Sequence, residues 1–114
     1  MTSAALQEPT FLILTALADR PRHGYGVIQE VLVLSAGQVK LRAGTLYGAL
    51  DRLGAQGLVA TAGEEVVDGR LRRYYRLTEA GQVTLAEEAA RLARNAQAAQ
   101  RRLRLRTVVE GGTA

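Results

Sequence analysis

Apolar positions near the start of the chain surround a helix on every side instead of forming one stripe. Pro9 suits the first turn of a helix, because its missing N–H has no partner there, and most residues from Phe11 to Ala18 are apolar. A helix that is apolar on all sides must be covered on all sides. In so short a chain this pattern predicts that part of the helix, including Phe11 and Leu14, contacts a second chain.

Two further helices are predicted before the middle of the chain. Arg20-Pro21-Arg22 ends the first helix, and the second is expected from about residue 24 to residue 35. A short extended connector then leads to a third helix, from 44 to about 56, where Gly57 favours a stop. The positions expected to face the core are Ile28, Val31, Leu32 and Leu34 in the second helix and Leu46, Leu50 and Leu53 in the third.

A β-hairpin is predicted over residues 58–78. Asp68-Gly69 is a strong signal for a two-residue turn, and pairing across it places Glu65 opposite Arg72 and Glu64 opposite Arg73. Side chains of a strand alternate between the two faces of the sheet. The core face is expected to hold Tyr75 opposite Ala62 and Leu77 opposite Ala60, and the outer face Arg70, Arg72, Tyr74 and Arg76.

The last predicted helix begins after Thr78, a good N-cap residue, and runs to about Arg106, with a frayed tail from Val108. A helix of about 28 residues is ~42 Å long, more than the rest of so small a chain can cover. Apolar residues recur along it at alternating spacings of four and three, which is typical of a coiled coil. This heptad stripe, predicted as a dimer interface, consists of Leu85, Ala89, Leu92, Ala96, Ala99 and Leu103.

The order of these elements predicts a mainly α fold with a small β wing. Three helices followed by a hairpin are typical of a winged helix-turn-helix domain, here residues 1–78, and residues 79–114 form a C-terminal dimerisation helix and tail. In this fold the third helix enters the major groove of DNA.

Composition excludes several classes of function. The 114 residues include no cysteine and one histidine, His23, which excludes disulfides and zinc sites of the Cys/His kind. There is no phosphate-binding loop, no Gly-x-Ser-x-Gly element and no apolar run of membrane-spanning length. Glu87 and Glu88 are interpreted as solvated charges near a helix N-terminus. We therefore expect a cytoplasmic protein that is not an enzyme, needs no cofactor or metal and contacts no membrane.

The charge pattern agrees with an acidic partner but does not require one. The net charge is +4, carried entirely by residues 41–114, and all but one of the 15 basic residues are arginines. Arginine binds phosphate and base edges well, although an arginine-rich codon bias would give the same composition. On the hairpin, Glu65 and Glu64 can pair with Arg72 and Arg73, whereas Arg70 and Arg76 have no acidic partner in the predicted register.

The third helix is the candidate for base contacts. With its leucines inside, Thr45, Tyr47 and Arg52 remain on outer or flanking positions. Tyr47 could instead be a half-buried core residue, and Arg52 an ordinary surface charge. Asp51 repels phosphate unless it accepts a hydrogen bond from cytosine.

Four blocks of sequence resemble the PadR family of bacterial transcriptional regulators, in its short form with a single C-terminal helix. The match spans roughly residues 9–92. The blocks are His23-Gly24-Tyr25-Gly26, Gly44-Thr45-Leu46-Tyr47, Gly57-Leu58-Val59 and Arg73-Tyr74-Tyr75-Arg76-Leu77-Thr78-Glu79-Ala80-Gly81.

The resemblance implies a homodimer that binds operator DNA, double-stranded and pseudo-palindromic, usually as a repressor, and that a small-molecule effector can release. Thr45 and Tyr47 would lie in the recognition helix, and Arg72, Arg73 and Tyr74 in the wing. Two positions depart from the family pattern, since Gly48 replaces a common proline and Asp51 a frequent basic residue. The alternative is a dimeric winged-helix adaptor that binds protein and not DNA.

Overall fold

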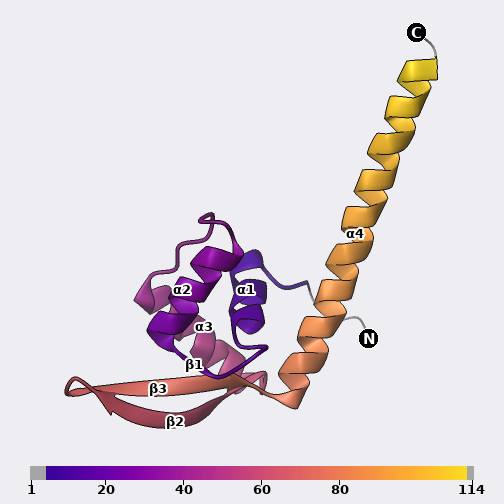
Figure 1. The fold of residues 1–114 in the computed structure, drawn as a ribbon. Coiled ribbons are helices and arrows are strands. Elements are labelled where there is room, and N and C mark those ends of the chain that lie inside the picture. Colours follow the sequence, from indigo (N-terminus) through magenta and orange to yellow (C-terminus); the bar gives the residue numbers. More distant parts are fainter. Residues whose placement is uncertain (1–4, 113–114) are drawn as a thin grey trace.

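The chain folds into four helices and a small antiparallel sheet, and the last helix projects from the rest of the molecule (Figure 1). The structure, a computed structural model, describes the backbone of residues 5–112 and the side chains of residues 5–107. The predicted mainly α fold with a small wing is confirmed. The elements are α1 (Glu8–Ala16), β1 (Arg22–His23), α2 (Gly24–Leu34), α3 (Ala43–Ala55), β2 (Val59–Val67), β3 (Arg70–Leu77) and α4 (Glu79–Gly112).

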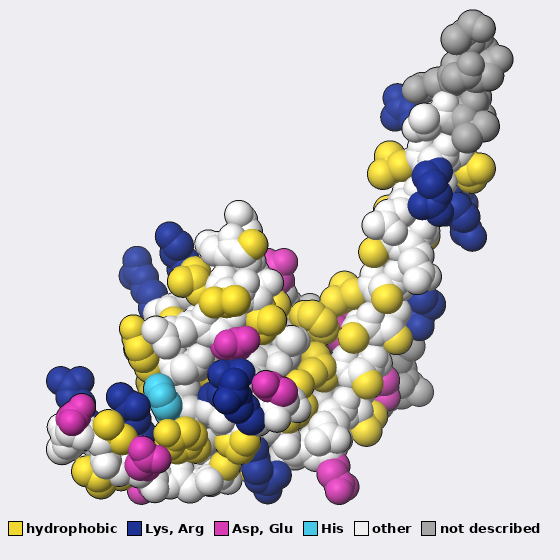
Figure 2. Space-filling model, in the orientation of Figure 1, with side chains coloured by type: hydrophobic (Ala, Val, Ile, Leu, Met, Phe, Trp, Pro, Cys, Tyr) yellow, Lys and Arg dark blue, Asp and Glu magenta, His cyan; other side chains and the backbone are white. Residues whose placement is uncertain are grey.

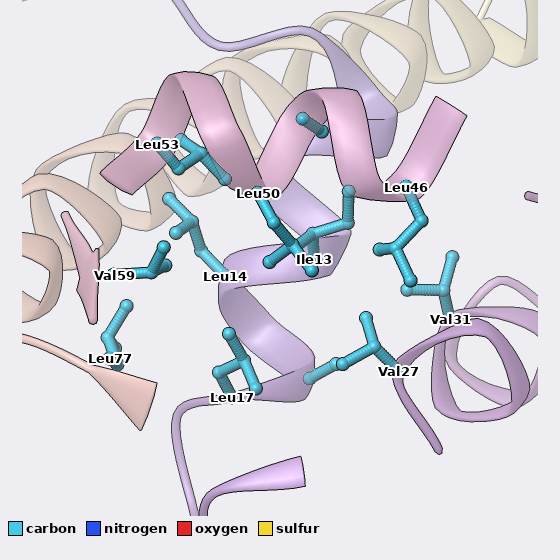
Figure 3. Packing of buried hydrophobic residues seen from close by; sticks show 12 residues of the cluster. Ile13, Leu14, Leu17, Val27, Val31, Leu46, Leu50, Leu53, Val59 and Leu77 are labelled. Carbon is cyan, nitrogen blue, oxygen red and sulfur yellow. The ribbon is translucent and has the colours of Figure 1, made fainter. Parts of the chain in front are cut away.

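The core lies where α1, α2 and α3 meet the base of the hairpin. Figure 3 shows the inward stripe of α3, Leu46, Leu50 and Leu53, above the side chains of α1 and α2. All three leucines are at most 3 % exposed, as the helical spacing predicted. The rest of the core comes from α1, α2 and the strands: Ile13, Leu14, Ala16, Leu17, Val27, Val31, Ala49, Val59 and Leu77.

The inner face of α2 differs from the prediction. Val31 is buried and Ile28 half-buried, but Leu32 and Leu34 are exposed, and Val27 is buried in their place. The pattern was misleading because residues 31–34 are all apolar, so the sequence alone does not mark which of them face inward. The burial of Val27 and Val31, one turn apart, shows which side of α2 packs on the core.

The sheet contains a strand that the sequence did not predict. Arg22 and His23 pair with Tyr75 and Tyr74 of β3, so the sheet order is β1-β3-β2. Arg22 also donates from Nε to the carbonyl of Ala16 (2.7 Å), which holds the end of α1 against this strand. Two residues are too few to give a strand pattern, and only the fold brings them beside β3.

The hairpin register is correct near the turn and wrong near the base. Asp68 and Gly69 both have positive φ, as a two-residue turn of this kind requires. Glu65 faces Arg72 and Glu64 faces Arg73, as predicted. A bulge between Thr61 and Gly63 then shifts the register, so Ala62 does not face Tyr75, nor Ala60 Leu77. The observed partners are Thr61 with Tyr75, Ala60 with Arg76 and Val59 with Leu77.

The base of α4 is fixed to the turn that follows α3. Thr78 Oγ1 accepts from the Gly81 N–H (3.0 Å), which confirms the predicted N-cap, and donates to the Gly57 carbonyl (2.6 Å). Gly81 is buried against the backbone of Leu58, and a Cβ at this position would lie against the Leu58 carbonyl oxygen and 2.6 Å from Leu77 Cδ1. Only glycine lets α4 approach this closely.

Beyond its base, α4 leaves the body of the protein. It runs to Gly112, so most of the predicted tail is helical, and residues 113–114 lie outside the described part of the chain. Every described side chain from Leu92 to Thr107 is exposed, and the molecule is 69 Å long but only 34 × 22 Å across. No helix within residues 5–112 is both long and apolar enough to span a membrane.

Glu88 corrects the interpretation of the acidic pair in α4. Its carboxylate is only 6 % exposed, where the sequence suggested a solvated charge. It accepts two hydrogen bonds from Arg91 and one from the backbone N–H of Leu6. The three donors compensate for the loss of water. The contact to Leu6 joins positions 82 residues apart, which no local pattern reveals.

We predict that Gly81→Val destabilises the protein by about 1–3 kcal/mol, because the larger side chain forces α4 away from Leu58. Gly44→Ala is the matched control and should not lower the melting temperature. A Cβ on this helical glycine meets nothing within 4 Å, and alanine favours helix over glycine by about 1 kcal/mol. Thermal unfolding by circular dichroism measures both. An unchanged melting temperature for Gly81→Val would contradict this account of the α4 base.

Candidate nucleic-acid interface

One cavity joins α2, α3 and the wing. It has a volume of about 440 Å³ and lies between the first turn of α2, the side chain of Tyr47 on α3 and the turn end of β3. We call it the α2–wing cavity. Figure 2 shows basic side chains at this end of the wing and others along α4. The lining residues are His23, Gly24, Tyr25, Tyr47, Arg70, Leu71, Arg72 and Arg73.

His23 connects α2 to the wing. Its Nδ1 accepts from the Gly26 N–H (3.2 Å), which caps α2. Its ring lies edge-on to Tyr74 of β3, with centroids 5.5 Å apart. Burial and the nearby Arg72 lower the pKa of His23 from its usual 6.5, against a smaller opposing effect of Glu65. The neutral form is the one that can accept the capping hydrogen bond.

Gly24 and Tyr47 fit together at the mouth of this cavity. Gly24 is buried, and a Cβ added to it would lie 2.7 Å from Tyr47 Cζ and also against the hydroxyl group. The ring of Tyr47 therefore rests on the backbone of α2, and the side chain remains 45 % exposed. Tyr47 thus packs against α2 with part of its ring and presents the rest at the surface, so each of the two interpretations of this residue holds in part.

The hairpin arginines divide into paired and unpaired groups. Arg73 Nε lies 3.4 Å from Glu64 Oε1, and a cavity of about 180 Å³ brings Arg73 together with Asp51 and Tyr75. Arg72 faces Glu65 across the strands, but no ion pair within 4 Å joins them. Among the residues the structure describes, Arg70, Arg72 and Arg76 are exposed and form no ion pair.

The remaining predicted contact residues lie apart from this cavity. Thr45 and Arg52 are exposed and seven residues apart on α3, hence on nearly the same side of the helix. Arg52 lines an open groove with Ala5, Leu6 and Gln7, on the side of α3 that faces the N-terminal segment. Arg76 and Tyr74 are not part of the lining, although Tyr74 touches it through His23.

Tyr25 and Gly24 were not predicted as site residues. Tyr25 is 62 % exposed and lines the cavity beside Arg70 and Arg72. The glycine of the His-Gly-Tyr block was the signal, because a glycine at a helix start lets another element approach the backbone closely.

The residues predicted for a dimer interface differ in how far they are buried within the protomer. Leu14 is fully buried within the protomer and has no surface to offer a second chain, whereas Phe11 is half-buried. Leu85 packs against the core. The other members of the heptad stripe are exposed: Ala89, Leu92, Ala96, Ala99 and Leu103.

Comparison with known proteins defines the class of this molecule. Residues 13–87 match the family described as the Transcriptional regulator PadR-like family. Transcriptional regulator Rv3488 of Mycobacterium tuberculosis is 45 % identical over 76 residues, which cover 67 % of each chain.

Solved structures show the same fold. A PadR family transcriptional regulator from Eggerthella lenta aligns with a TM-score of 0.66 at 29 % identity, over 82 % of this chain and 80 % of that one. Bacillus subtilis PadR, solved in complex with operator DNA, aligns with a TM-score of 0.62 at 17 % identity, over 71 % of this chain and 46 % of that one.

The fold and the match along the chain thus define a winged-helix transcriptional regulator. The protein belongs to the PadR-like family. Because this family consists of transcriptional regulators, the expectation that the chain is not an enzyme is confirmed.

We predict that NMR titration of the single histidine gives a pKa below 6.5, that Arg72→Gln raises this pKa, and that Glu65→Gln lowers it further. Because the unfolded chain takes up the proton first, acidification from above pH 6.5 through the folded pKa destabilises the protein. Arg101→Gln, a distant substitution on α4, should leave the pKa unchanged. A pKa at or above 6.5 would contradict the arrangement around His23.

Proposed function

We propose that the protein binds operator DNA as a homodimer, with α3 in the major groove and the wing on the adjacent backbone. The supporting observation is the α2–wing cavity, which places Tyr47 of α3 beside the unpaired Arg70 and Arg72 of the wing. A phosphate backbone next to the major groove would meet both elements. The operator complex of Bacillus subtilis PadR, a protein of the same fold, supports this proposal.

The proposed contacts fall into two groups. Thr45, Tyr47 and Arg52 are exposed on α3, with Tyr47 on one flank of the buried stripe and Thr45 and Arg52 on the other, and base edges or nearby phosphates are within reach of a recognition helix there. On the wing, Arg70, Arg72 and Arg76 contact phosphates. Arg73 contributes less because Glu64 already neutralises it, and Tyr74 acts by holding His23 in place.

We expect the double variant Arg70→Ala/Arg76→Ala to weaken operator binding and to reduce its salt dependence. The slope of log K against log salt becomes shallower by about 0.9 for each phosphate that the protein no longer neutralises. Fluorescence anisotropy with duplexes from the region upstream of the gene measures both quantities. Arg101→Ala/Arg102→Ala removes the same charge from α4 and should leave the slope unchanged. Binding of the unmodified protein that is indifferent to salt would contradict the proposal and favour the adaptor alternative.

The homodimer is proposed to form through residues 79–114, with residues 1–78 as the DNA-binding unit. Support comes from α4, whose stripe of Ala89, Leu92, Ala96, Ala99 and Leu103 lies exposed on a helix that leaves the body. Burying leucine side chains contributes about 2 kcal/mol each, and a second α4 has the matching stripe. On an operator with half-sites one helical turn apart, the two α3 helices of this dimer would lie about 34 Å apart, in successive major grooves.

We predict that Leu92→Glu converts the dimer to monomers in sedimentation experiments, because each copy would place a carboxylate in the apolar contact. Val83→Glu is the matched control. Val83 is 57 % exposed and lies on the side of α4 opposite the heptad stripe, so this variant should remain dimeric. A folded Leu92→Glu protein that stays dimeric would show that the stripe is not the interface.

Repression and release by a small molecule complete the proposal. A dimer docked on an operator blocks access of other proteins to the same DNA. An effector that binds more tightly to a dimer with the wrong spacing of its α3 helices would lower DNA affinity by that difference in binding. The chain contains no tryptophan, so such an effector would contact leucine, alanine and Phe11 side chains.

A further inference from the structure

Leu85 packs helix α4 against the core, and on either side of this residue hydrogen bonds hold the helix to the body of the protein at two separate points. The first is its base, where Thr78 donates to the Gly57 carbonyl and Gly81 packs on the Leu58 backbone. The second is Glu88, seven residues further along, which corresponds to about 10 Å of helix. A helix held at one point can change its direction, whereas a helix held at two points has a defined direction.

The second anchor consists of Glu88, Arg91 and the backbone of Leu6. Arg91 donates from Nε to Glu88 Oε1 (2.7 Å) and from Nη2 to Oε2 (2.8 Å). The Leu6 N–H donates to Oε2 at 2.8 Å, and the Leu6 side chain packs against the core. These hydrogen bonds, those from Arg91 first, lower the pKa of Glu88 to about 2. The carboxylate is therefore charged at any pH near neutral, so this anchor does not depend on pH in that range.

The first anchor ties α4 to α3. Gly57 and Leu58 follow α3 directly, and their N–H groups donate back to the carbonyls of Gly54 (3.0 Å) and Leu53 (2.9 Å). The carbonyls of the same two residues accept hydrogen bonds from Thr78. The end of α3 and the start of α4 thus share one turn. The direction of α4 is in this way defined relative to α3.

Small changes of direction become large displacements along α4. From Glu88 to Gly112 the helix extends for about 36 Å, and a tilt of about 5° at Glu88 moves its far end by about 3 Å. That displacement is close to the ~3.4 Å rise of one base pair of DNA. No described side chain beyond Arg91 is buried against the body, so the two anchors and the packing of Leu85 between them determine the direction.

We propose that Glu88 is a positioning residue that determines which half-site spacing the dimer accepts. This inference rests on the proposed function, because it requires a dimer joined through α4 that contacts two half-sites. Glu88 is distant from the α2–wing cavity in the sequence and is not part of its lining. Glu88 acts by fixing the angle between α4 and α3 in each protomer. A substitution of Glu88 therefore changes the preferred spacing without changing the contacts to either half-site.

The test compares affinities for operators that differ only in spacing. Selection from random duplexes with the unmodified protein supplies the operator, and variants of it carry one or two base pairs more or fewer between the half-sites. A duplex with a single half-site reports on the DNA-contacting surface alone. The proteins are the unmodified chain, Glu88→Ala, Glu88→Gln and Arg91→Lys, with Glu79→Gln as the control, because Glu79 is exposed on the same helix and its substitution makes the same change in charge.

We expect the unmodified protein and Glu79→Gln to lose about tenfold in affinity when the spacing changes by one base pair, equivalent to about 1.4 kcal/mol. Glu88→Ala should lose about threefold or less, while its affinity for the single half-site stays within about twofold. Glu88→Gln and Arg91→Lys keep most of the side-chain volume but lose the paired charged hydrogen bonds. They should give intermediate preferences and serve as the test if Glu88→Ala does not fold.

Two results would overturn the inference. One is a folded Glu88 or Arg91 variant with the spacing preference of the unmodified protein. The other is an equal loss of affinity for all duplexes, the single half-site included, which would give Glu88 a role in stability only. Failure of the proposed function is distinct from both, because the unmodified protein would then select no operator or bind a full operator no better than a half-site.

Discussion

The inward packing of Leu46, Leu50 and Leu53 determines how α3 is oriented, and the candidate interface follows from that orientation. Once this stripe faces α1 and α2, the rest of α3 is left at the surface, with Thr45 and Arg52 on one flank of the stripe and Tyr47 on the other. Each buried leucine contributes about 2 kcal/mol, so rotation of α3 about its axis would be costly. The same packing brings the end of α3 to the turn that holds α4.

The wing combines attraction to DNA with internal neutralisation. Glu64 and Glu65 lie opposite Arg73 and Arg72, yet only Arg73 is close enough to its partner to form an ion pair. Exposed ion pairs contribute little to stability, so the acidic residues matter more for the local charge than for the fold. Two of the three unpaired arginines, Arg70 and Arg72, line the α2–wing cavity with Tyr47 and Tyr25, and this placement gives the wing a basic side toward α3.

Local sequence patterns predicted the elements, because each depends on residues close together in the chain. The stripe of α3 follows from a spacing of four and three, the hairpin turn from Asp68-Gly69 and the start of α4 from the Thr78 cap. The candidate DNA-contacting residues follow from the same patterns, since an amphipathic helix exposes whatever it does not bury. Long-range pairings could not be predicted this way. The bulge after Thr61, the two-residue β1 and the contact of Leu6 with Glu88 all depend on segments that meet only in the folded chain.

The sequence by itself determined the order and type of the elements and the family, since periodicity, turn residues and motif blocks are local properties. The tertiary structure decided which side of each element is available. It buried Leu14 and exposed Leu34, although both are apolar residues in helices. It also decided which charges are covered, because Glu88, paired with Arg91 one turn along its own helix, is bound by the Leu6 N–H only in the folded chain, while Arg70 meets no acidic partner among the described residues. Burial and ion pairing depend on distances in space, and only the folded chain defines those distances.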